Sequence, residues 1–120
     1  IFGGPGDDTI YGGNGNDVIC TGSGNNVIDG GNGDDTIHTQ GNATVTGGSG
    51  TDTFIIGPSG TVQITDWWNN EVIDLTSWAA NPRFLQVAPN SVLIFDGARG
   101  VEVNSPIAIT VAQVRERVLL

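Results

Sequence analysis

Acidic and amide side chains recur at one fixed place of a nine-residue unit in the first half of the chain. The unit reads Gly-Gly-x-Gly-x-Asp-x-apolar-x, with copies beginning at Gly3, Gly12, Thr21, Gly30 and Gly47. Three glycines in four positions accept positive φ angles and allow a tight turn whose carbonyl oxygens point inward. A carboxylate beside such carbonyls suits a hard cation with six to eight oxygen ligands, which favours Ca²⁺ over Mg²⁺ or Zn²⁺. The candidate metal ligands are the position-six side chains with the first and third glycines of the complete copies: Asp8, Asp17, Asn26, Asp35, Asp52, Gly3, Gly6, Gly12, Gly15, Gly30, Gly33, Gly47 and Gly50.

Position eight of the unit is always apolar, and this predicts the elements that hold the turns. One inward apolar residue between two outward residues makes a three-residue strand, so each unit is a turn followed by a strand. Such units stack into a parallel β-solenoid and bury their apolar residues in its interior. One copy, from Thr39, is a residue short and lacks its Asp. The expected interior residues are Ile10, Ile19, Ile28, Ile37, Val45 and Phe54.

These repeats resemble the calcium-binding nonapeptides of the repeats-in-toxin (RTX) family. Four copies, from Gly3, Gly12, Gly30 and Gly47, match the pattern at every fixed position. The resemblance implies a calcium-binding parallel β-roll in which two consecutive repeats make one coil. It also implies that each ion lies between one turn and the turn two repeats further on. A flexible Gly/Asn linker is the alternative, and the constant register disfavours it.

Same-side turns then come from alternate repeats, so the position-six residues fall into two columns. One column has three carboxylates and predicts two complete calcium sites. The other has a carboxylate, an amide and a methyl group, which predicts one weaker site and then no ordinary site. The two columns are Asp17, Asp35 and Asp52, and Asp8, Asn26 and Ala43.

The expected energetics make the metal structural. One interior side chain per repeat contributes ~1.5–3 kcal/mol, whereas ordering each backbone residue costs ~1–2 kcal/mol. Two carboxylates at the strand spacing of ~4.8 Å repel by ~1 kcal/mol in water and by ~3.5 kcal/mol at an effective dielectric constant of 20. A cation between them reverses the sign. We therefore expect the roll to be largely unfolded without Ca²⁺ and to fold as the ion binds.

The remaining polar residues of the repeats are expected to have no catalytic role. Asp7 and Asp34, at position five, are expected to be solvated and not to bind metal. Cys20 and His38 occupy position nine, an outward place on a strand, and the sequence offers the one His no catalytic partner. We therefore do not expect an enzyme.

Composition restricts the partners. The 120 residues carry a formal net charge of −9 and no Lys, which argues against nucleic acid and anionic membranes as partners. No hydrophobic run is long enough to span a membrane. An acidic, Gly-rich first half would stay disordered in a calcium-poor cytoplasm and fold outside the cell, where Ca²⁺ is abundant. We expect a secreted, extracellular protein.

From Ile56 the nonapeptide is no longer recognisable. Residues 1–55 are therefore expected to form the β-roll, and residues 56–120 a capping segment of the same domain. An Asp-Gly turn at residues 96–100 predicts a hairpin, and Thr110 with Gln113 fits a capping box before a short helix that extends to Leu119. The expected strands, an antiparallel continuation of the roll, cover residues 61–65, 72–75, 84–87, 92–95 and 101–103.

The start of the capping segment resembles a phrase in RTX tails of serralysin-type proteases and of alginate epimerase R-modules. It reads Ile-Thr-Asp-Trp at residues 64–67 and Val-Ile-Asp-Leu-Thr at residues 72–76. Asp66 and Asp74 are candidates for a further ion or, as we favour, for polar roles in a turn and at a strand edge. Trp67, Trp68 and Trp78 are candidates for sugar stacking or, as we favour, for the core of the cap.

Two functions are compatible with these patterns. The first is a non-catalytic calcium-responsive module of a larger secreted protein; the RTX resemblance implies that this protein is bacterial, that a type I secretion machinery exports it, and that the module stabilises an N-terminal passenger. The alternative is an adhesive or polysaccharide-binding module. Ile1 and Phe2 occupy positions eight and nine of a unit, so we interpret the chain as a fragment. The resemblance implies that the last segment, or residues beyond Leu120, belong to the secretion signal.

Overall fold

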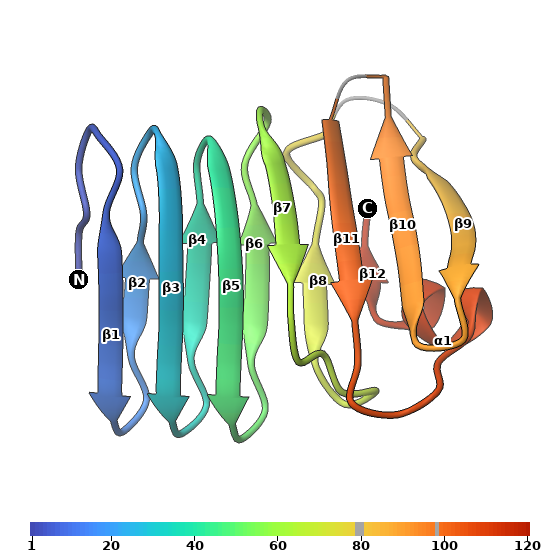
Figure 1. Cartoon of the computed structure of the whole chain (residues 1–120), viewed down its shortest axis with the longest axis horizontal. Helices are drawn as coiled ribbons and strands as arrows, with labels where there is room; N and C mark the ends of the chain where they lie inside the picture. Colours follow the sequence, from blue (N-terminus) through green and yellow to red (C-terminus); the bar gives the residue numbers. More distant parts are fainter. Residues whose placement is uncertain (79–80, 98) are drawn as a thin grey trace.

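The computed structural model describes residues 1–78, 81–97 and 99–120. Most of these residues belong to strands, which alternate between two sheets along the first two thirds of the chain (Figure 1). The elements are β1 (Thr9–Asn14), β2 (Val18–Cys20), β3 (Asn25–Asn32), β4 (Thr36–Thr39), β5 (Asn42–Ser49), β6 (Thr53–Ile56), β7 (Thr61–Ile64), β8 (Val72–Asp74), β9 (Arg83–Ala88), β10 (Ser91–Asp96), β11 (Arg99–Asn104), α1 (Val111–Glu116) and β12 (Val118–Leu119).

The two sheets are the two sides of a parallel solenoid. One has the order β1-β3-β5-β7-β11-β10-β9 and the other β12-β8-β6-β4-β2. Each strand pairs with the strand two units further on, so that Ile10 lies opposite Ile28 and Ile19 opposite Ile37. This register confirms the predicted parallel β-roll, with two consecutive repeats in each coil.

The interior follows from the strand alternation that the repeats predict. All six expected interior side chains are buried, and those of Ile19, Ile37, Val45 and Phe54 have no exposed surface. The damaged copy keeps its place in the stack. Its missing residue falls in the turn, and Val45 still pairs in register with Ile28.

The parallel coil continues past the last recognisable repeat. β7 pairs in parallel with β5, and β8 pairs in parallel with β6. The prediction of strands in residues 61–65 and 72–75 is confirmed, but the prediction that they begin an antiparallel region is wrong. The physical reason is that inward Ile64 and Ile73 still fall at position eight of two further nine-residue units, residues 57–65 and 66–74.

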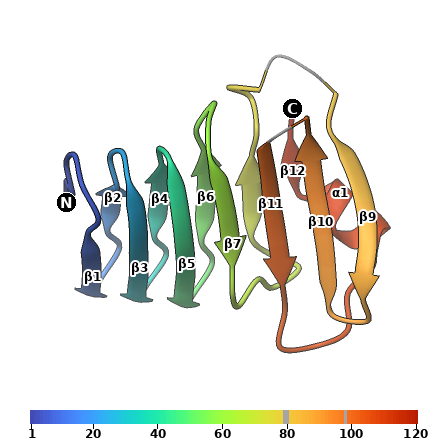
Figure 2. The same cartoon turned by 45° about the horizontal axis from the view of Figure 1, so that its top comes forward.

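The cap begins where β11 joins β7 in parallel and then pairs antiparallel with β10, which pairs with β9. Figure 2 shows α1 behind these strands, at the same end of the molecule. The β10–β11 connection is the predicted hairpin, with Asp96 opposite Arg99; Ala98, part of the predicted turn, lies outside the described residues. Trp67 and Trp78 are buried in the core as favoured, whereas Trp68 is 39% exposed.

The C-terminal helix is shorter than predicted. Its capping box is present, because Thr110 accepts the Gln113 N–H and Gln113 accepts the Thr110 N–H. The helix ends at Glu116, and Val118 and Leu119 form β12, paired in parallel with β8. The open edge of β8 offers unpaired backbone groups, and bonding to them replaces a further helical turn. No helix in the described parts of the chain is long and apolar enough to cross a bilayer.

Candidate metal centre

Three aspartates stack directly above one another on the turns that lead into β2, β4 and β6. The backbone N–H of Asp17 donates to Oδ1 of Asp35 at 2.8 Å, and the N–H of Asp35 donates to Oδ1 of Asp52 at 2.9 Å. The carboxylates of Asp35 and Asp52 are therefore each held by the turn of the preceding coil. The structure thus brings together the three carboxylates that the sequence places in one column.

The second oxygen of each of these carboxylates has no partner. Oδ2 of Asp17, Asp35 and Asp52 is buried without a hydrogen bond, and Asp35 and Asp52 are only 1% and 0% exposed. Burial is the main cause that raises the pKa of Asp35 and of Asp52, and the neighbouring carboxylates raise both pKa values further. Buried polar atoms are almost always satisfied in native proteins. The orphaned oxygens therefore fit a bound cation.

Backbone carbonyls complete this oxygen lining. A Cβ added at Gly30 would lie 2.5 Å from Oδ2 of Asp35 and 2.5 Å from the carbonyl oxygen of Gly47. Added Cβ atoms at Gly12 and Gly47 would collide in the same way with the oxygens around Asp17 and Asp52. Only glycine leaves this space open between carboxylate and carbonyl.

The third glycine of each unit lets successive turns lie close together. Gly15, Gly33 and Gly50 have φ angles of +102°, +122° and +122°. A Cβ on Gly33 would overlap the carbonyl oxygen of Gly15, and one on Gly50 would overlap that of Gly33. Within the described chain no three His, Cys, Asp or Glu side chains converge. The carbonyls of these turns must therefore supply most of the ligands.

When bound, Ca²⁺ supplies positive charge and accepts six to eight oxygen ligands. The residues that would hold it are the position-six carboxylates and the carbonyls of the turns on either side of it. Binding of Ca²⁺ at two complete sites, Asp17 with Asp35 and Asp35 with Asp52, remains a prediction. The stacking of these three carboxylates agrees with that prediction.

The turns on the other side of the coil have a different composition. Asp8 donates its N–H to Oδ1 of Asn26 at 2.9 Å, in the same relation as the aspartates above. Nδ2 of Asn26, however, donates to the carbonyl oxygen of Gly22 in its own turn. Next in the stack come Ala43 and then Val62, both buried. Of this set only Asp8 has an orphaned buried oxygen, which leaves the weaker site predicted at Asp8 and Asn26 with one carboxylate.

The side chains at position five have a structural role. Oδ1 of Asp7 accepts the N–H of Asn25, and Oδ1 of Asp34 accepts the N–H of Thr51, both at 2.8 Å. Both aspartates are exposed to solvent. They tie each turn to the turn of the next coil, and their exposure agrees with the expectation of solvated groups.

Glu71 is a buried acid that the sequence did not place in a site. The β6–β8 pairing puts it next after Asp52, so the acidic column consists of Asp17, Asp35, Asp52 and Glu71. Its side chain has no exposed surface. Oε2 accepts the backbone N–H of Trp68 at 3.0 Å, and Oε1 has no N–H or hydroxyl donor. Burial, followed by the negative charges of Asp52 and Asp66 and by a hydrogen bond shared with the Asp52 carboxyl, raises the pKa of Glu71 to about 8. The signal that could have found it is the persistence of nine-residue spacing without the glycines.

Asp66 and Asp74 have the polar roles that we favoured. Asp66 accepts the N–H groups of Gly47 and Gly48 at 2.9 and 2.8 Å. Asp74 accepts the N–H and the hydroxyl of Thr76 within its own turn. Both carboxylates therefore stabilise backbone at the end of the roll.

Comparison with known proteins adds independent support. The family model of the RTX calcium-binding nonapeptide repeat, in four copies, matches residues 1–28 and 21–42. No curated protein sequence matches the chain. The matched residues form the first coils of the parallel solenoid described above, and their position-six side chains begin both columns. The repeats within residues 1–42 therefore match the family of RTX calcium-binding nonapeptide repeats, and the parallel solenoid fits a domain of this kind.

Proposed function

We propose that this chain is the calcium-dependent folding module of a larger secreted bacterial protein. The observation that carries the proposal is the row of buried Oδ2 atoms on Asp17, Asp35 and Asp52, none of which has a hydrogen-bond partner. Stacked, buried carboxylates destabilise the coil unless a cation lies between them. Calcium binding then supplies folding free energy, because the sites do not exist in the unfolded chain.

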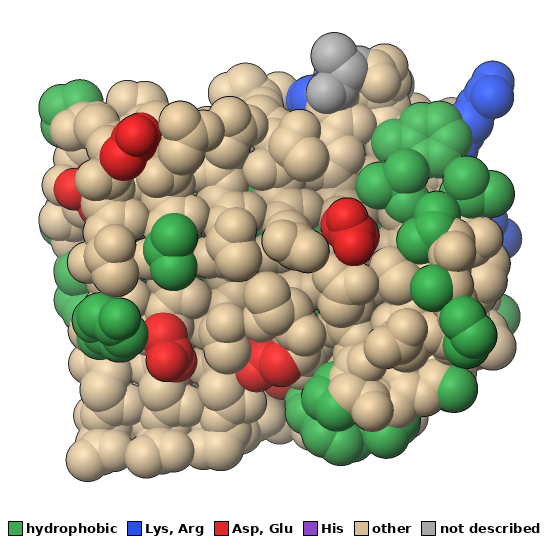
Figure 3. All heavy atoms as spheres, in the orientation of Figure 1, with side chains coloured by type: hydrophobic (Ala, Val, Ile, Leu, Met, Phe, Trp, Pro, Cys, Tyr) green, Lys and Arg blue, Asp and Glu red, His purple; other side chains and the backbone are tan. Residues whose placement is uncertain are grey.

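The location of this switch follows from calcium concentrations and from charge. Extracellular calcium modules bind with dissociation constants of ~10⁻⁴–10⁻³ M, so sites of that class stay empty inside a cell. On the face seen in Figure 3 the roll carries scattered acidic groups, and basic side chains lie only towards the cap. With a net charge of −9 the empty chain repels itself and stays unfolded for a type I secretion machinery. After export it folds and stabilises the passenger on its N-terminal side.

Far-ultraviolet circular dichroism during a Ca²⁺ titration tests the folding step, with Mg²⁺ as the control ion. We expect a transition from coil to β structure between sub-millimolar and millimolar Ca²⁺ and none with Mg²⁺. Asp35→Ala should damage the transition more than Asp8→Ala, because Asp35 belongs to two predicted sites and Asp8 to one. A chain already folded in chelator would contradict the switch.

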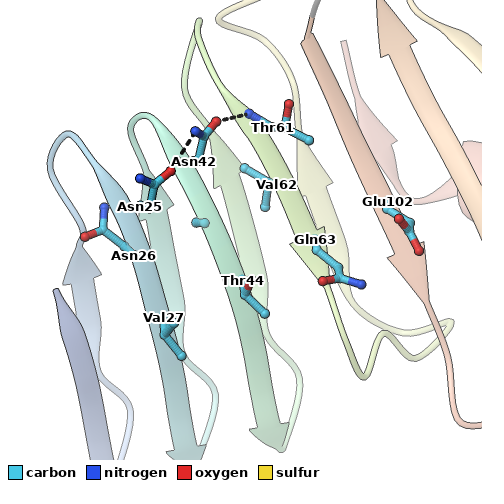
Figure 4. Close-up of a pocket in the computed structure, with 10 residues that line it drawn as sticks. Asn25, Asn26, Val27, Asn42, Thr44, Thr61, Val62, Gln63 and Glu102 are labelled. Carbon is cyan, nitrogen blue, oxygen red and sulfur yellow. Dashed lines mark hydrogen bonds between the residues drawn. The ribbon is translucent and has the colours of Figure 1, made fainter. Parts of the chain in front are cut away.

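A second candidate is a polysaccharide-binding module, favoured by a shallow hollow on the outer face of β3, β5 and β7. It has a volume of about 370 Å³ and is lined mainly by amide, hydroxyl and small apolar groups. Figure 4 shows an amide ladder along its rim, where Asn42 donates to Asn25 at 2.8 Å and the Thr61 N–H donates to Asn42 at 2.9 Å. Glu102 is the one charged residue in the lining, so a neutral glycan fits better than an anionic one.

This candidate ranks second because the hollow has no aromatic side chain on which a sugar ring could stack. Affinity electrophoresis of the calcium-loaded chain in gels with neutral or uronic-acid polysaccharides would test it. Retardation by a neutral glycan that Gln63→Ala weakens is the expected result. Unchanged mobility in every gel would remove this candidate and leave the folding module untouched.

A further inference from the structure

The acidic column extends one turn beyond the recognisable repeats. The glycine turn (residues 47–52) leads into β6, and the tryptophan turn (residues 66–71) leads into β8. β6 and β8 pair in parallel, and the Val72 N–H donates to the carbonyl oxygen of Asp52 at 3.1 Å. The two turns are therefore related as the turns around Asp17 and Asp35 are, although the tryptophan turn contains no glycine.

Each of these two turns contributes a buried carboxylate oxygen without a partner. Asp52 and Glu71 both have no exposed surface, and Oδ2 of Asp52 and Oε1 of Glu71 receive no N–H or hydroxyl donor. The two carboxyl groups lie within hydrogen-bonding reach of each other, so a proton shared between them is the alternative to a cation. The longer Glu side chain explains how an atypical turn still reaches the column. Oε2 bonds back to the Trp68 N–H of its own turn, which leaves Oε1 free of protein donors.

A surface hollow lies between the outer parts of the two turns. This hollow of about 400 Å³ is lined by residues 48–50 of the glycine turn and residues 68–70 of the tryptophan turn. The N–H groups of Gly47 and Gly48, which would repel a cation, are bonded to Asp66. The nearby guanidinium of Arg117 donates to the carbonyl oxygens of Asn70 and Glu71 and leaves both carboxylates unpaired.

We propose that Asp52 and Glu71 hold a further Ca²⁺ between the glycine turn and the tryptophan turn. Oδ2 of Asp52 and Oε1 of Glu71 are its charged ligands, and carbonyls of the glycine turn with water from the hollow complete the shell. A hard divalent cation fits these oxygens, because the site has no nitrogen or sulfur ligand. The inference rests on the proposed function, since it requires the ordinary sites of the column to bind calcium.

Such a site would connect the repeats to the cap. Trp67, within the tryptophan turn, is fully buried in the core shared with the cap strands. Its backbone N–H donates to the carbonyl oxygen of Asn104, at the end of β11. An ion that orders the tryptophan turn therefore also orders the first contact of the cap, so that roll and cap fold as one unit.

Native mass spectrometry in Ca²⁺ tests the site by counting bound ions. We expect Glu71→Gln, which keeps the size of the side chain and removes its charge, to bind one ion fewer than the wild-type chain. Glu102→Gln makes the same change in charge on the outer face of β11 and should keep the wild-type count. An equal count in Glu71→Gln and the wild type would overturn the proposal.

Measurements on the wild-type chain distinguish a failure of the proposed function from a failure of the further site. A wild-type chain that binds no Ca²⁺ contradicts the proposed function, whereas one that folds with Ca²⁺ while Glu71→Gln keeps every ion contradicts only the further site. If Glu71→Gln fails to fold, crystals of the wild-type chain grown with Tb³⁺ decide the question. An anomalous peak between Asp52 and Glu71 is expected. Peaks at the other acidic pairs without this one would overturn the proposal.

Discussion

The position-six side chains form one column on each side of the solenoid, and the two columns differ in whether their polar atoms find partners within the protein. The acidic column keeps a carboxylate at all four places, from Asp17 to Glu71. The mixed column, on the opposite side of the same coils, loses its charge at the second place and its polarity at the third. Its members are Asp8, Asn26, Ala43 and Val62.

Asn26 shows what this difference means. Its Oδ1 does what Oδ1 of Asp35 does, accepting the N–H of the turn one coil earlier. The second atom differs: Nδ2 of Asn26 donates to the Gly22 carbonyl, whereas Oδ2 of Asp35 has no partner. An amide group thus completes its own turn, while a carboxylate leaves a place for a cation. On the proposed function, one side of the coil therefore depends on calcium, and the other side depends on it less from one coil to the next.

Val62→Asp would break this contrast most strongly. Val62 is fully buried, with Ala43 before it and Val101 after it in the sheet. A carboxylate there has no acidic neighbour with which to share an ion, and an unpaired buried charge costs about 3–5 kcal/mol. We expect loss of the folded state by circular dichroism even in millimolar Ca²⁺.

Val62→Asn is the matched control, because it has the same shape without the charge. It should fold in Ca²⁺ with a lower melting temperature than the wild type. If Val62→Asp recovered with Ca²⁺ to the level of Val62→Asn, the mixed column would hold an ion at this place. The contrast between the columns would then be wrong.

The acidic column also depends on its glycines, and Gly33 and Gly15 provide a matched pair. Both are third glycines of their units with positive φ, so alanine at either strains the backbone by ~1–3 kcal/mol. A Cβ at Gly33 would also overlap the Gly15 carbonyl oxygen, whereas one at Gly15 meets nothing within 4 Å. Gly33→Ala should therefore need several-fold more Ca²⁺ to fold than Gly15→Ala.

The same circular dichroism titration measures both midpoints. Equal midpoints would mean that the neighbouring turn moves aside at no cost. In that case the close stacking of the turns would not determine where the carboxylates lie. The Gly15→Ala chain shows how much of the effect is backbone strain alone.

The sequence predicts the roll well because its two signals are local. Position six and position eight of each copy predict the columns and the interior, and the register of Asp17 with Asp35 agrees with both. The signal fails where the glycines disappear. Position eight continues at Ile64 and Ile73, but a period with only one apolar place per nine residues is not visible without its glycine turns.

Glu71 and β12 were missed for different reasons. Glu71 falls at position six of the nine-residue unit 66–74, but this unit has no glycines and is recognised only once β8 is seen to pair with β6. Val118 and Leu119 fit a helical face, but the open edge of β8 offers backbone partners that a local pattern does not record. Tertiary pairing of this kind overrides local preference.

Asn26→Asp tests the contrast between the acidic and mixed columns, and it is the prediction with the smallest expected effect. The new carboxylate keeps Oδ1 as the acceptor for the Asp8 N–H, but it replaces the Nδ2 donor that satisfies the Gly22 carbonyl. Without calcium the chain loses this hydrogen bond and gains repulsion with Asp8 of ~1 kcal/mol or more. With calcium the turn acquires the ligands of the acidic column.

The expected result is therefore opposite in sign in the two conditions. In chelator any residual structure decreases, whereas the Ca²⁺ dependence of folding becomes steeper. Native mass spectrometry should find the site between Asp8 and the substituted residue filled more readily than the same site of the wild-type chain. Asn25→Asp makes the same change in charge at the exposed neighbouring place, where Oδ1 already accepts a bond from Asn42, and should leave the count of ions unchanged. A similar response of both variants would contradict this explanation. It would show that the net charge separates the two columns, and not whether the second side-chain atom at position six, Nδ2 or Oδ2, has a hydrogen-bond partner.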